Sequence, residues 1–329
     1  MKKKSTSYKL INLLADGKFH SGESLGDKLN ISRAGVWKSI QKLGEYGIQV
    51  DSVPRSGYRI LHGMELLTSS AIEDNFTLLT RNALDDLLIL TDTTSTNDHL
   101  LTFAKKIPAT TLACFAEYQS AGRGRRGRQW IAPFGSNIYH SLLWNFDKDP
   151  AEIMGLSLAV AVAITRALGK IGVSEGLQLK WPNDVLWQGR KLSGVLIDVL
   201  AEPHEHCHVI IGIGINTYIP PTYAPQIDQP WVDLYKITDK PVERNRLASI
   251  LLNELVAMLT EFNREGLTPF VEEWESFNVM QGKSVTLHTP QGKIEGVMQG
   301  ISPQGALRLF TKENQSQEFM SGELSLRMK

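Results

Sequence analysis

Apolar residues recur at helical spacing in three short stretches near the start of the chain. The first stretch has its apolar face at Leu10, Leu13 and Leu14 and stops before Gly17. A second stretch follows Ser21 and a third follows Ser32, and serine favours a helix start because its hydroxyl accepts a hydrogen bond from a free amide of the first turn. The apolar positions of these two stretches are Leu25 and Leu29, then Val36, Ile40 and Leu43. The pattern predicts three helices, and the bend between the last two is typical of a helix-turn-helix.

After Gly47 the apolar spacing changes from the helical period to strict alternation. Two short alternating runs, 48–50 and 58–60, flank Pro54-Arg55-Ser56-Gly57. Alternating runs around a turn-forming segment predict a β-hairpin. Following a helix-turn-helix, this hairpin would form a wing with a basic tip.

The rest of the chain mixes both periods beyond a short linker at 62–69. A strand is predicted from Thr110 to Tyr118, a buried helix from Ile153 to Leu168 and an amphipathic helix from Val242 to Asn263. The apolar helix is shorter than the ~20 residues of a membrane span. From Gln281 onward short strands alternate with glycine turns, which indicates a small all-β barrel.

Composition restricts the class of protein. The chain has 329 residues, 42% hydrophobic and 21% charged, as in ordinary globular proteins of two or three domains. Its two cysteines, Cys114 and Cys207, lack metal-ligand spacing, so we expect no disulfide framework and a reducing cytoplasm. The basic first residues lack an apolar region, so we expect no secretory signal.

Charge is unevenly distributed, although the net charge is zero. Residues 1–63 hold eleven Lys and Arg against five acidic residues. A basic N-terminal segment suits a polyanion as partner, although a small helical docking module with a solvated face would have the same composition.

The segment resembles the winged helix-turn-helix of bacterial repressors. We expect DNA contacts from Gly22, Ser32, Arg33, Trp37, Lys38, Gln41 and Arg55. Tight binding would need two copies on a palindromic site.

A cluster of arginines and glycines follows the predicted strand at 110–118. Three glycines and four arginines occupy Gly122-Arg123-Gly124-Arg125-Arg126-Gly127-Arg128, and Trp130 follows. Crowded guanidinium groups repel one another until an anion arrives, and their geometry suits phosphate or carboxylate. We therefore predict a loop that is disordered until a small anionic ligand binds. The spacing also matches a dinucleotide fingerprint, but Pro133 prevents the helix which that motif requires. An RNA-binding tract and a merely solvated loop are further alternatives.

Four other segments carry polar groups near strand ends. Ser95-Thr96-Asn97 could bind a polar ligand or simply cap a helix. In Lys180-Trp181-Pro182-Asn183-Asp184 the proline ends strand pairing and leaves a turn, where Asn183 and Asp184 could meet a metal or a ribose. Lys191 begins a strand in Arg190-Lys191-Leu192-Ser193-Gly194, where a surface lysine is the ordinary interpretation. Gly212 and Gly214 precede Asn216 and let a ligand lie flat against the backbone.

The order and spacing of these motifs resemble those of biotin–protein ligases. The arginine–glycine loop, Lys180 to Asp184, Arg190 to Gly194 and Gly212 to Asn216 all match. With the N-terminal domain included, the chain resembles the bacterial bifunctional ligases that also repress the biotin operon. The resemblance implies an α+β multidomain fold: a winged helix-turn-helix (1–63), a central mixed-sheet α/β ligase domain of the biotin/lipoate ligase type (64–275) and a small SH3-like β-barrel (276–329).

The resemblance also implies roles for individual residues. Lys191 and Arg125 would be catalytic. Biotin would be surrounded by Ser95, Thr96, Asn97, Gln119, Gly122, Arg123, Gly124, Arg125, Lys191, Gly194, Gly212 and Gly214. ATP and the adenylate would be bound by Arg125, Arg128, Trp130, Lys180, Asn183, Asp184, Asn216, Trp231 and Arg327, with Mg²⁺ at Asp184 and Asn216. One departure is Asp98, because close relatives are expected to carry an amide at this position.

The implied activity joins biotin to a protein through an adenylate. Biotin and ATP would give biotinyl-5′-AMP, which transfers biotin to a lysine of the biotin carboxyl carrier protein of acetyl-CoA carboxylase. Biotinyl-5′-AMP would also favour a homodimer that binds the operator DNA of the biotin operon, in the cytoplasm and without a membrane. A lipoate-type ligase and a non-catalytic ligand-sensing repressor are the alternatives.

His204, His206 and His208 alternate around Cys207, but we expect solvated histidines rather than a metal site.

Overall fold

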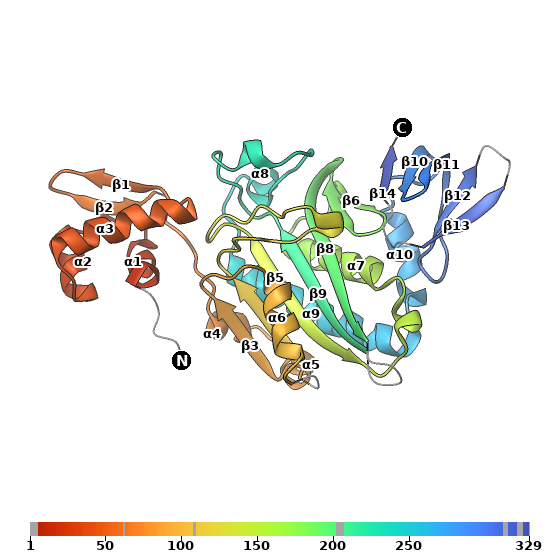
Figure 1. Cartoon of the computed structure of the whole chain (residues 1–329), viewed down its shortest axis with the longest axis horizontal. Coiled ribbons are helices and arrows are strands. Elements are labelled where there is room, and N and C mark those ends of the chain that lie inside the picture. Colours follow the sequence, from red (N-terminus) through yellow and green to blue (C-terminus); the bar gives the residue numbers. More distant parts are fainter. Residues whose placement is uncertain are drawn as a thin grey trace.

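The computed structural model describes residues 6–61, 63–107, 110–201, 207–311, 315–320 and 325–328. Figure 1 shows three parts in chain order: a small helical domain at one end, a central sheet with helices, and a second, smaller sheet at the other end. The α+β organisation predicted from the sequence is confirmed, with the mixed sheet in the central part.

The N-terminal part contains the predicted helices and hairpin. Its elements are α1 (Thr6–Leu14), α2 (Gly22–Leu29), α3 (Arg33–Leu43), the short 3-10 helix η1 (Gly44–Tyr46), β1 (Val50–Val53) and β2 (Gly57–Ile60). The Ser21 hydroxyl accepts from the Ser24 amide and the Ser32 hydroxyl from the Gly35 amide, so both serines cap helices as expected. Leu10, Leu14, Leu25, Val36 and Leu43 are completely buried and form the core between these elements.

The central sheet has seven strands in the order β3-β4-β5-β9-β8-β7-β6. These strands are β3 (Asp86–Leu90), β4 (Leu112–Ala116), β5 (Ile138–Phe146), β6 (Leu177–Lys180), β7 (Asp184–Trp187), β8 (Arg190–Ala201) and β9 (Cys207–Ile215). Only β3 and β4 pair in parallel; the other neighbours are antiparallel, which makes the sheet mixed.

Helices cover both faces of this sheet. On one face α6 (Thr96–Ala104) packs against Cys114, while α7 (Leu156–Lys170) and α9 (Arg244–Glu265) pack with Ala113 and Phe115 on the other. The remaining helices are α4 (Ser69–Glu73), α5 (Leu78–Ala83), α8 (Leu234–Thr238), η2 (Arg125–Gly127), η3 (Pro150–Ile153) and η4 (Ala224–Gln226). Because helices cover both faces of the sheet here, all five residues of β4 are buried.

The apolar segment around α7 belongs to the core. The segment Pro150–Lys170 is long and apolar enough to cross a membrane, by length and composition alone. However, 67% of its most apolar stretch is buried inside the protein. Residues such as Val160 and Ile164 are completely buried in the cluster that also contains α9. The segment is thus a core helix, as its sequence predicted.

The C-terminal part is the predicted small β domain. It follows η5 (Thr268–Phe270) and α10 (Val271–Ser276) and contains β10 (Ser284–Thr289), β11 (Gly292–Ile301), β12 (Leu307–Thr311), β13 (Ser316–Phe319) and β14 (Ser325–Met328). These strands form an antiparallel sheet in the order β13-β12-β11-β10-β14. The indole Nε1 of buried Trp181 donates to the Gly305 carbonyl (3.1 Å), which ties this part to the central sheet.

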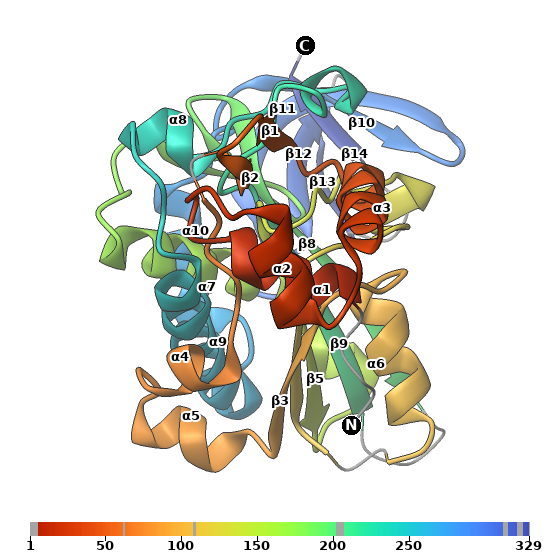
Figure 2. The same cartoon turned by 90° about the vertical axis from the view of Figure 1, so that its left-hand side faces the viewer.

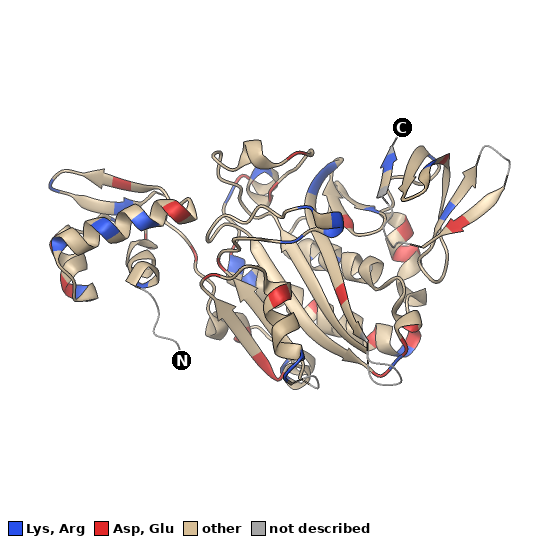
Figure 3. Cartoon of the chain, viewed as in Figure 1, with Lys and Arg blue, Asp and Glu red and all other residues tan. Residues whose placement is uncertain are grey.

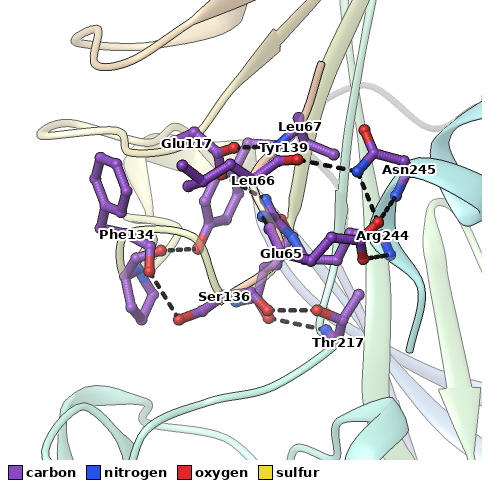
Figure 4. A network of polar contacts seen from close by, with 12 residues as sticks. Glu65, Leu66, Leu67, Glu117, Phe134, Ser136, Tyr139, Thr217, Arg244 and Asn245 are labelled. Carbon is purple, nitrogen blue, oxygen red and sulfur yellow. Dashed lines mark hydrogen bonds and ion pairs between the residues drawn. The ribbon is translucent and has the colours of Figure 1, made fainter. Parts of the chain in front are cut away.

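A buried polar network fastens the linker to the central part (Figure 4). The guanidinium of Arg244, at the start of α9, donates to Glu117 Oε2 (2.8 Å), to the Glu65 carbonyl (2.6 Å) and to the Asn137 carbonyl (2.8 Å). Glu117 Oε1 accepts from the Leu67 amide (2.5 Å). The Arg244 side chain is 5% exposed and that of Glu117 is 1% exposed, so this ion pair is held away from water.

Aromatic rings form a second connection between the first two parts. Tyr46 contacts Tyr118 edge-on, with ring centroids 5.2 Å apart, and Phe134 at 5.4 Å. Figure 2, which views the molecule from the N-terminal end, shows α1 to α3 in front of the central strands. Because Tyr118 precedes the arginine–glycine loop and Phe134 follows it, the N-terminal domain touches both ends of that loop.

Candidate active site

The arginine–glycine loop and strands β8 and β9 enclose a cleft of about 470 Å³. Its walls come from the N-terminus of α6, from the loop and from the two strands. Most of the residues expected to surround biotin line it: Ser95, Thr96, Asn97, Gln119, Arg123, Gly124, Arg125, Lys191, Gly194, Gly212 and Gly214. Gly122 lies in the same loop but not in the lining. Segments separated by more than a hundred residues therefore meet at one place.

The glycines of β9 are required by close side-chain contacts. A Cβ atom on Gly212 would lie 2.2 Å from Asn97 Oδ1, and one on Gly214 would lie 2.4 Å from Trp130 Cε2. A Cβ atom on Gly194 of β8 would lie 3.1 Å from Lys191 Cε and 3.2 Å from the Trp130 ring. Side chains from α6 and the loop therefore occupy the space above the two β9 glycines, and a ligand lying flat against this backbone stays a prediction.

Polar groups at the start of α6 are held in fixed orientations. Gln119 Oε1 accepts from the Thr96 amide (2.8 Å) and from its hydroxyl (3.2 Å). Ser141 Oγ, on β5, donates to Asn97 Oδ1 (2.6 Å) and lies 2.7 Å from Thr96 Oγ1. Ser95 is the residue before the first turn of α6, but its side chain makes no capping bond there. These buried donors and acceptors can orient a polar ligand.

The loop itself forms a short hairpin. The Gly124 amide donates to the Arg128 carbonyl (2.7 Å) and the Trp130 amide to the Gly122 carbonyl (2.8 Å). Arg126 and Gly127 at its tip have positive φ values of 58° and 71°. No helix follows it, which agrees with our rejection of a dinucleotide fingerprint. Disorder of this loop before ligand binding stays a prediction.

Arg125 and Lys191 line the same cleft. Arg125 donates to Asn183 Oδ1 (3.2 Å), and burial lowers the pKa of its guanidinium. Lys191 Nζ lies 2.6 Å from Asp184 Oδ1 and 5.5 Å from the centre of the Trp130 ring, and its side chain is only 16% exposed. The surface-lysine interpretation of Lys191 is therefore wrong.

A second hollow of about 410 Å³ lies beside the cleft. Trp130, Lys191, Asn216 and Trp231 line it together with residues 226–229. Asn216 donates to the Val232 carbonyl (3.2 Å), and Lys236 Nζ lies 3.5 Å from the centre of the Trp231 ring. Trp130 and Lys191 belong to both hollows and form the boundary between them.

Further cations gather near this boundary. Burial lowers the pKa of Lys180, Asp184 raises it, and the positive charges of Lys191, Arg327 and Arg128 lower it again. Arg327 belongs to β14, so the C-terminal part contributes charge to the site. Asp184 is the first residue of β7, paired with Lys180, rather than part of a free turn. Cations of this density attract phosphate.

Sequence reasoning missed Asp198 and Ser141. Asp198 Oδ2 accepts from Asn97 Nδ2 (2.9 Å), and both Asp198 oxygens accept from Arg123. Asp98, noted above as a departure, also accepts from Arg123 (2.8 Å). The alternation of β8 could have revealed Asp198, because it shares a face with Gly194 at even spacing.

The residues expected to bind DNA lie together on the N-terminal part. Arg33, Trp37, Lys38 and Gln41 are exposed on α3, Trp37 being 54% exposed, and the capping residue Ser32 is exposed just before it. Arg55 is exposed at the hairpin tip with φ +67°, while Gly22 starts α2 and is half-buried. Figure 3 shows the basic residues along α3 and at the tip of the hairpin.

The histidine run of β9 is described only in part. His204 and His206 lie outside the described residues. His208 Nδ1 lies 2.5 Å from Asn145 Oδ1, which gives that ring a side-chain partner. Within the described residues no group of three or more His, Cys, Asp or Glu side chains could hold a metal.

Three family models match successive parts of this chain. The model described as an HTH domain matches residues 6–59, and the biotin/lipoate A/B protein ligase family matches residues 88–216. The biotin protein ligase C terminal domain matches residues 281–327.

Similar proteins match over most or all of the length. The bifunctional ligase/repressor BirA of Escherichia coli is 38% identical over 99% of both chains, and that of Bacillus subtilis is 32% identical over 91% of both. A solved structure of biotin protein ligase from Aquifex aeolicus in complex with biotin and ATP is 31% identical. It covers 75% of this chain and all of its own, with a TM-score of 0.63.

Proposed function

Because this chain belongs to the biotin/lipoate A/B protein ligase family, with a helix-turn-helix domain before the ligase, we propose that it attaches biotin to protein and represses transcription. The observation that carries the ligase activity is the position of Lys191. It stands between two adjoining hollows, with Trp130 beside it. An enzyme that joins a carboxylic acid to a nucleotide needs a cation at such a boundary.

The cleft over β8 and β9 binds biotin in this proposal. Its polar end groups are Ser95, Thr96, Asn97 and Gln119, and Gly122 to Arg125 form the cover. Gly194, Gly212 and Gly214 line the cleft beside the flat bicyclic ring, and they let Asn97 and Trp130 pack closely against the floor. The bonds within this group support the assignment, because oriented donors and acceptors fix a ureido group without rearrangement.

The second hollow takes the nucleotide. Trp231 stacks on the adenine, and Asn216 and Asn183 lie near the ribose and phosphates. Arg125, Arg128, Lys180 and Arg327 neutralise the phosphates, and Trp130 lies between the two ligands. The positive charges of Arg128 and Arg327 lower the pKa of Lys180, which means that these cations lie near one another and supports a common anion site.

The reaction proceeds in two steps. Biotin's carboxylate oxygen attacks the α-phosphorus of ATP, pyrophosphate leaves, and biotinyl-5′-AMP forms. A lysine amine of the carrier protein then attacks the acyl carbon, loses a proton, and AMP leaves. Negative charge grows on phosphate and acyl oxygens in both steps, so Lys191 and Arg125 act as preplaced cations. The loop excludes water from the mixed anhydride.

Magnesium enters with ATP in this scheme. Mg²⁺ is usually held by one or two carboxylates together with substrate phosphates, rather than by a cage of protein ligands. Asp184 offers one carboxylate beside the phosphate cations, and the Asn216 side-chain oxygen accompanies it. These residues fit such a partial site, where the ion would neutralise phosphate charge.

The N-terminal domain binds operator DNA of the biotin operon. Arg33, Trp37, Lys38 and Gln41 face solvent on α3, which supports major-groove contacts, with Ser32 and Gly22 at the helix starts and Arg55 on the wing. We place the bounds of the three domains at 1–63, 64–275 and 276–329. The protein works in the cytoplasm and needs no membrane.

Biotinyl-5′-AMP acts as the corepressor by favouring a homodimer. Ordering of the arginine–glycine loop by this ligand shifts the equilibrium toward the form that dimerises. Sedimentation with and without biotinyl-5′-AMP tests this step. Equal dimerisation in both conditions would exclude it.

Incubation with biotin, ATP, Mg²⁺ and a carrier domain, followed by mass spectrometry, tests the ligase activity. We expect one biotinyl group on one carrier lysine, no product with lipoate in place of biotin, and a loss of roughly 10²- to 10³-fold in rate for Lys191→Ala. Transfer by Lys191→Ala at the normal rate would remove the assignment of Lys191. Transfer of lipoate in preference to biotin would make the chain a lipoate-type ligase.

A further inference from the structure

Arg123 differs from the other cations of its loop because two carboxylates hold it. Its Nη1 donates to Asp98 Oδ1 (2.8 Å) and to Asp198 Oδ2 (3.0 Å), while Nη2 donates to Asp198 Oδ1 (3.2 Å). The two bonds to Asp198 run in parallel, which is the bidentate geometry of strong arginine–carboxylate pairs. The single guanidinium of Arg123 therefore pairs with two carboxylates at once.

The three partners come from three different elements. Arg123 belongs to the loop hairpin, Asp98 to the first turn of α6 and Asp198 to the outer half of β8. Among the described residues, the loop from Gly122 to Arg128 meets the body of the domain at this point through side chains, whereas its hairpin bonds are internal. Asp198 also accepts from Asn97 Nδ2 (2.9 Å), and Asn97 lies against Gly212 on the cleft floor. One carboxylate thus connects the loop to the floor.

The charge of this group argues against a direct role for Arg123 in holding a phosphate. Two carboxylates against one guanidinium leave an excess of negative charge, which repels an anionic ligand. Arg125 and Lys191 line the same cleft but have other partners: Arg125 donates to Asn183, and Lys191 pairs with Asp184. Burial lowers the pKa of Arg123 while Asp198 and Asp98 raise it, with a net increase.

We propose that Arg123 is a positioning residue: its side chain, paired with Asp98 and Asp198, acts as a latch that stabilises the closed position of the loop over the biotin cleft, which ligand binding also favours. This inference rests on the proposed function, because biotin is the ligand whose binding the latch favours. The chemical role of the loop is thereby divided, with Arg123 fixing the backbone and Arg125 meeting the acyl phosphate.

The latch can open, because all three side chains remain partly in water. Arg123 is 39% exposed, Asp98 42% and Asp198 22%. Exposed ion pairs are individually weak and are screened by salt. When only a fraction of the protein has its loop closed, the apparent affinity for biotin falls by that fraction. Loss of the latch should therefore raise the KM for biotin and leave kcat unchanged.

The test compares the full chain with Asp198→Asn, Asp98→Asn, Arg123→Gln and the double variant Arg123→Gln/Asp198→Asn. Pyrophosphate release is measured against biotin concentration at two salt concentrations. We expect a KM for biotin raised roughly fivefold in each single variant, with kcat within twofold. The double variant should be no worse than Arg123→Gln. Added salt should raise the KM of the wild type more than that of the variants.

A direct contact between Arg123 and the ligand predicts the opposite sign. In that case Asp198→Asn would release the guanidinium and leave the KM for biotin unchanged or lower, and the effects of Arg123→Gln and Asp198→Asn would add. Either result would overturn the latch. Asp98→Asn provides the same test without disturbing the Asn97 contact, should Asp198→Asn fold poorly.

Glu318→Gln is the matched control. It breaks another exposed arginine–carboxylate pair, Arg308 Nε to Glu318 Oε1 at 2.9 Å, on β12 and β13 of the C-terminal sheet. Its KM for biotin should equal that of the wild type. A wild type that releases no pyrophosphate with biotin would defeat the proposed function, whereas an active wild type with unaltered latch variants would defeat the latch alone.

Discussion

Two arginines in this protein are each held by acidic side chains, yet their surroundings differ. Arg244 is 5% exposed and its guanidinium is shared among Glu117 and two backbone carbonyls. Arg123 is 39% exposed and is bound by Asp98 and Asp198. The first site joins the linker to α9 and the end of β4, and the second joins a loop to a ligand cleft.

The difference shows how burial decides what an ion pair can do. A buried charge that loses its partner has no water to replace it, so the Arg244 network is either complete or strongly unfavourable. An exposed pair exchanges with water at little cost. Both sites pair an arginine with carboxylates, but only the exposed pair can open and close during a catalytic cycle.

Removing the carboxylate from the buried site should have the largest effect. Glu117→Ala leaves the Arg244 guanidinium without its charged partner and the Leu67 amide without its acceptor. We expect a loss of about 3–5 kcal/mol in the free energy of unfolding, measured by urea denaturation.

A paired replacement distinguishes the loss of charge pairing from the loss of hydrogen bonds to the backbone. Glu117→Leu/Arg244→Met exchanges both charges for apolar groups of similar size and should recover most of the stability. If the double variant were as unstable as Glu117→Ala, the backbone bonds of Arg244 to residues 65 and 137 would be the main contribution, and the contrast with Arg123 would rest on hydrogen bonding instead of charge.

The sequence revealed the loop site more readily than the buried network for a physical reason. Arg123 lies in a run of contiguous glycines and arginines, and such local crowding of like charge is visible without a structure. Glu117 and Arg244 are 127 positions apart, and each alone resembles an ordinary surface charge. Neither a periodicity nor a motif brings them together; only the packing of α9 against β4 and β5 does.

The same distinction applies to the fold. Ser21 and Ser32 were predictable as helix caps because a cap acts over three residues. The order of the central sheet was not predictable, because β9 pairs on one side with β5, which precedes it by sixty or more residues, and on the other side with its sequence neighbour β8. Asp198 falls between these cases: its face followed from alternation, but its partners Arg123 and Asn97 did not.

A second buried group, His140, sharpens the contrast because it is uncharged. His140, on β5, is 1% exposed, stacks on Phe115 and has its Nδ1 3.2 Å from the Cys114 carbonyl. Burial lowers its pKa to about 3, from 6.5. Below pH 6.5 the unfolded chain takes up a proton at this residue and the folded chain does not, so the free energy of unfolding falls as the pH is lowered toward 3.

Comparison with His140→Leu isolates this effect from other titrations. Between pH 7 and pH 5 the wild type should lose about 2 kcal/mol more than the variant, at ~1.4 kcal/mol per pH unit below 6.5. Urea denaturation at both pH values gives the difference. Equal losses in the two proteins would mean that folded His140 can be protonated at pH 5 despite its burial.

The smallest effect is expected at the exposed site, and it decides whether the two arginines truly differ. Arg123→Gln removes the charge between Asp98 and Asp198 but leaves both carboxylates in contact with water. We expect a change in the free energy of unfolding of no more than about 1 kcal/mol, by the same urea assay used for Glu117→Ala. A loss as large as that of Glu117→Ala would make Arg123 a structural group of the fold, and the freedom of its loop to open would no longer follow from its exposure.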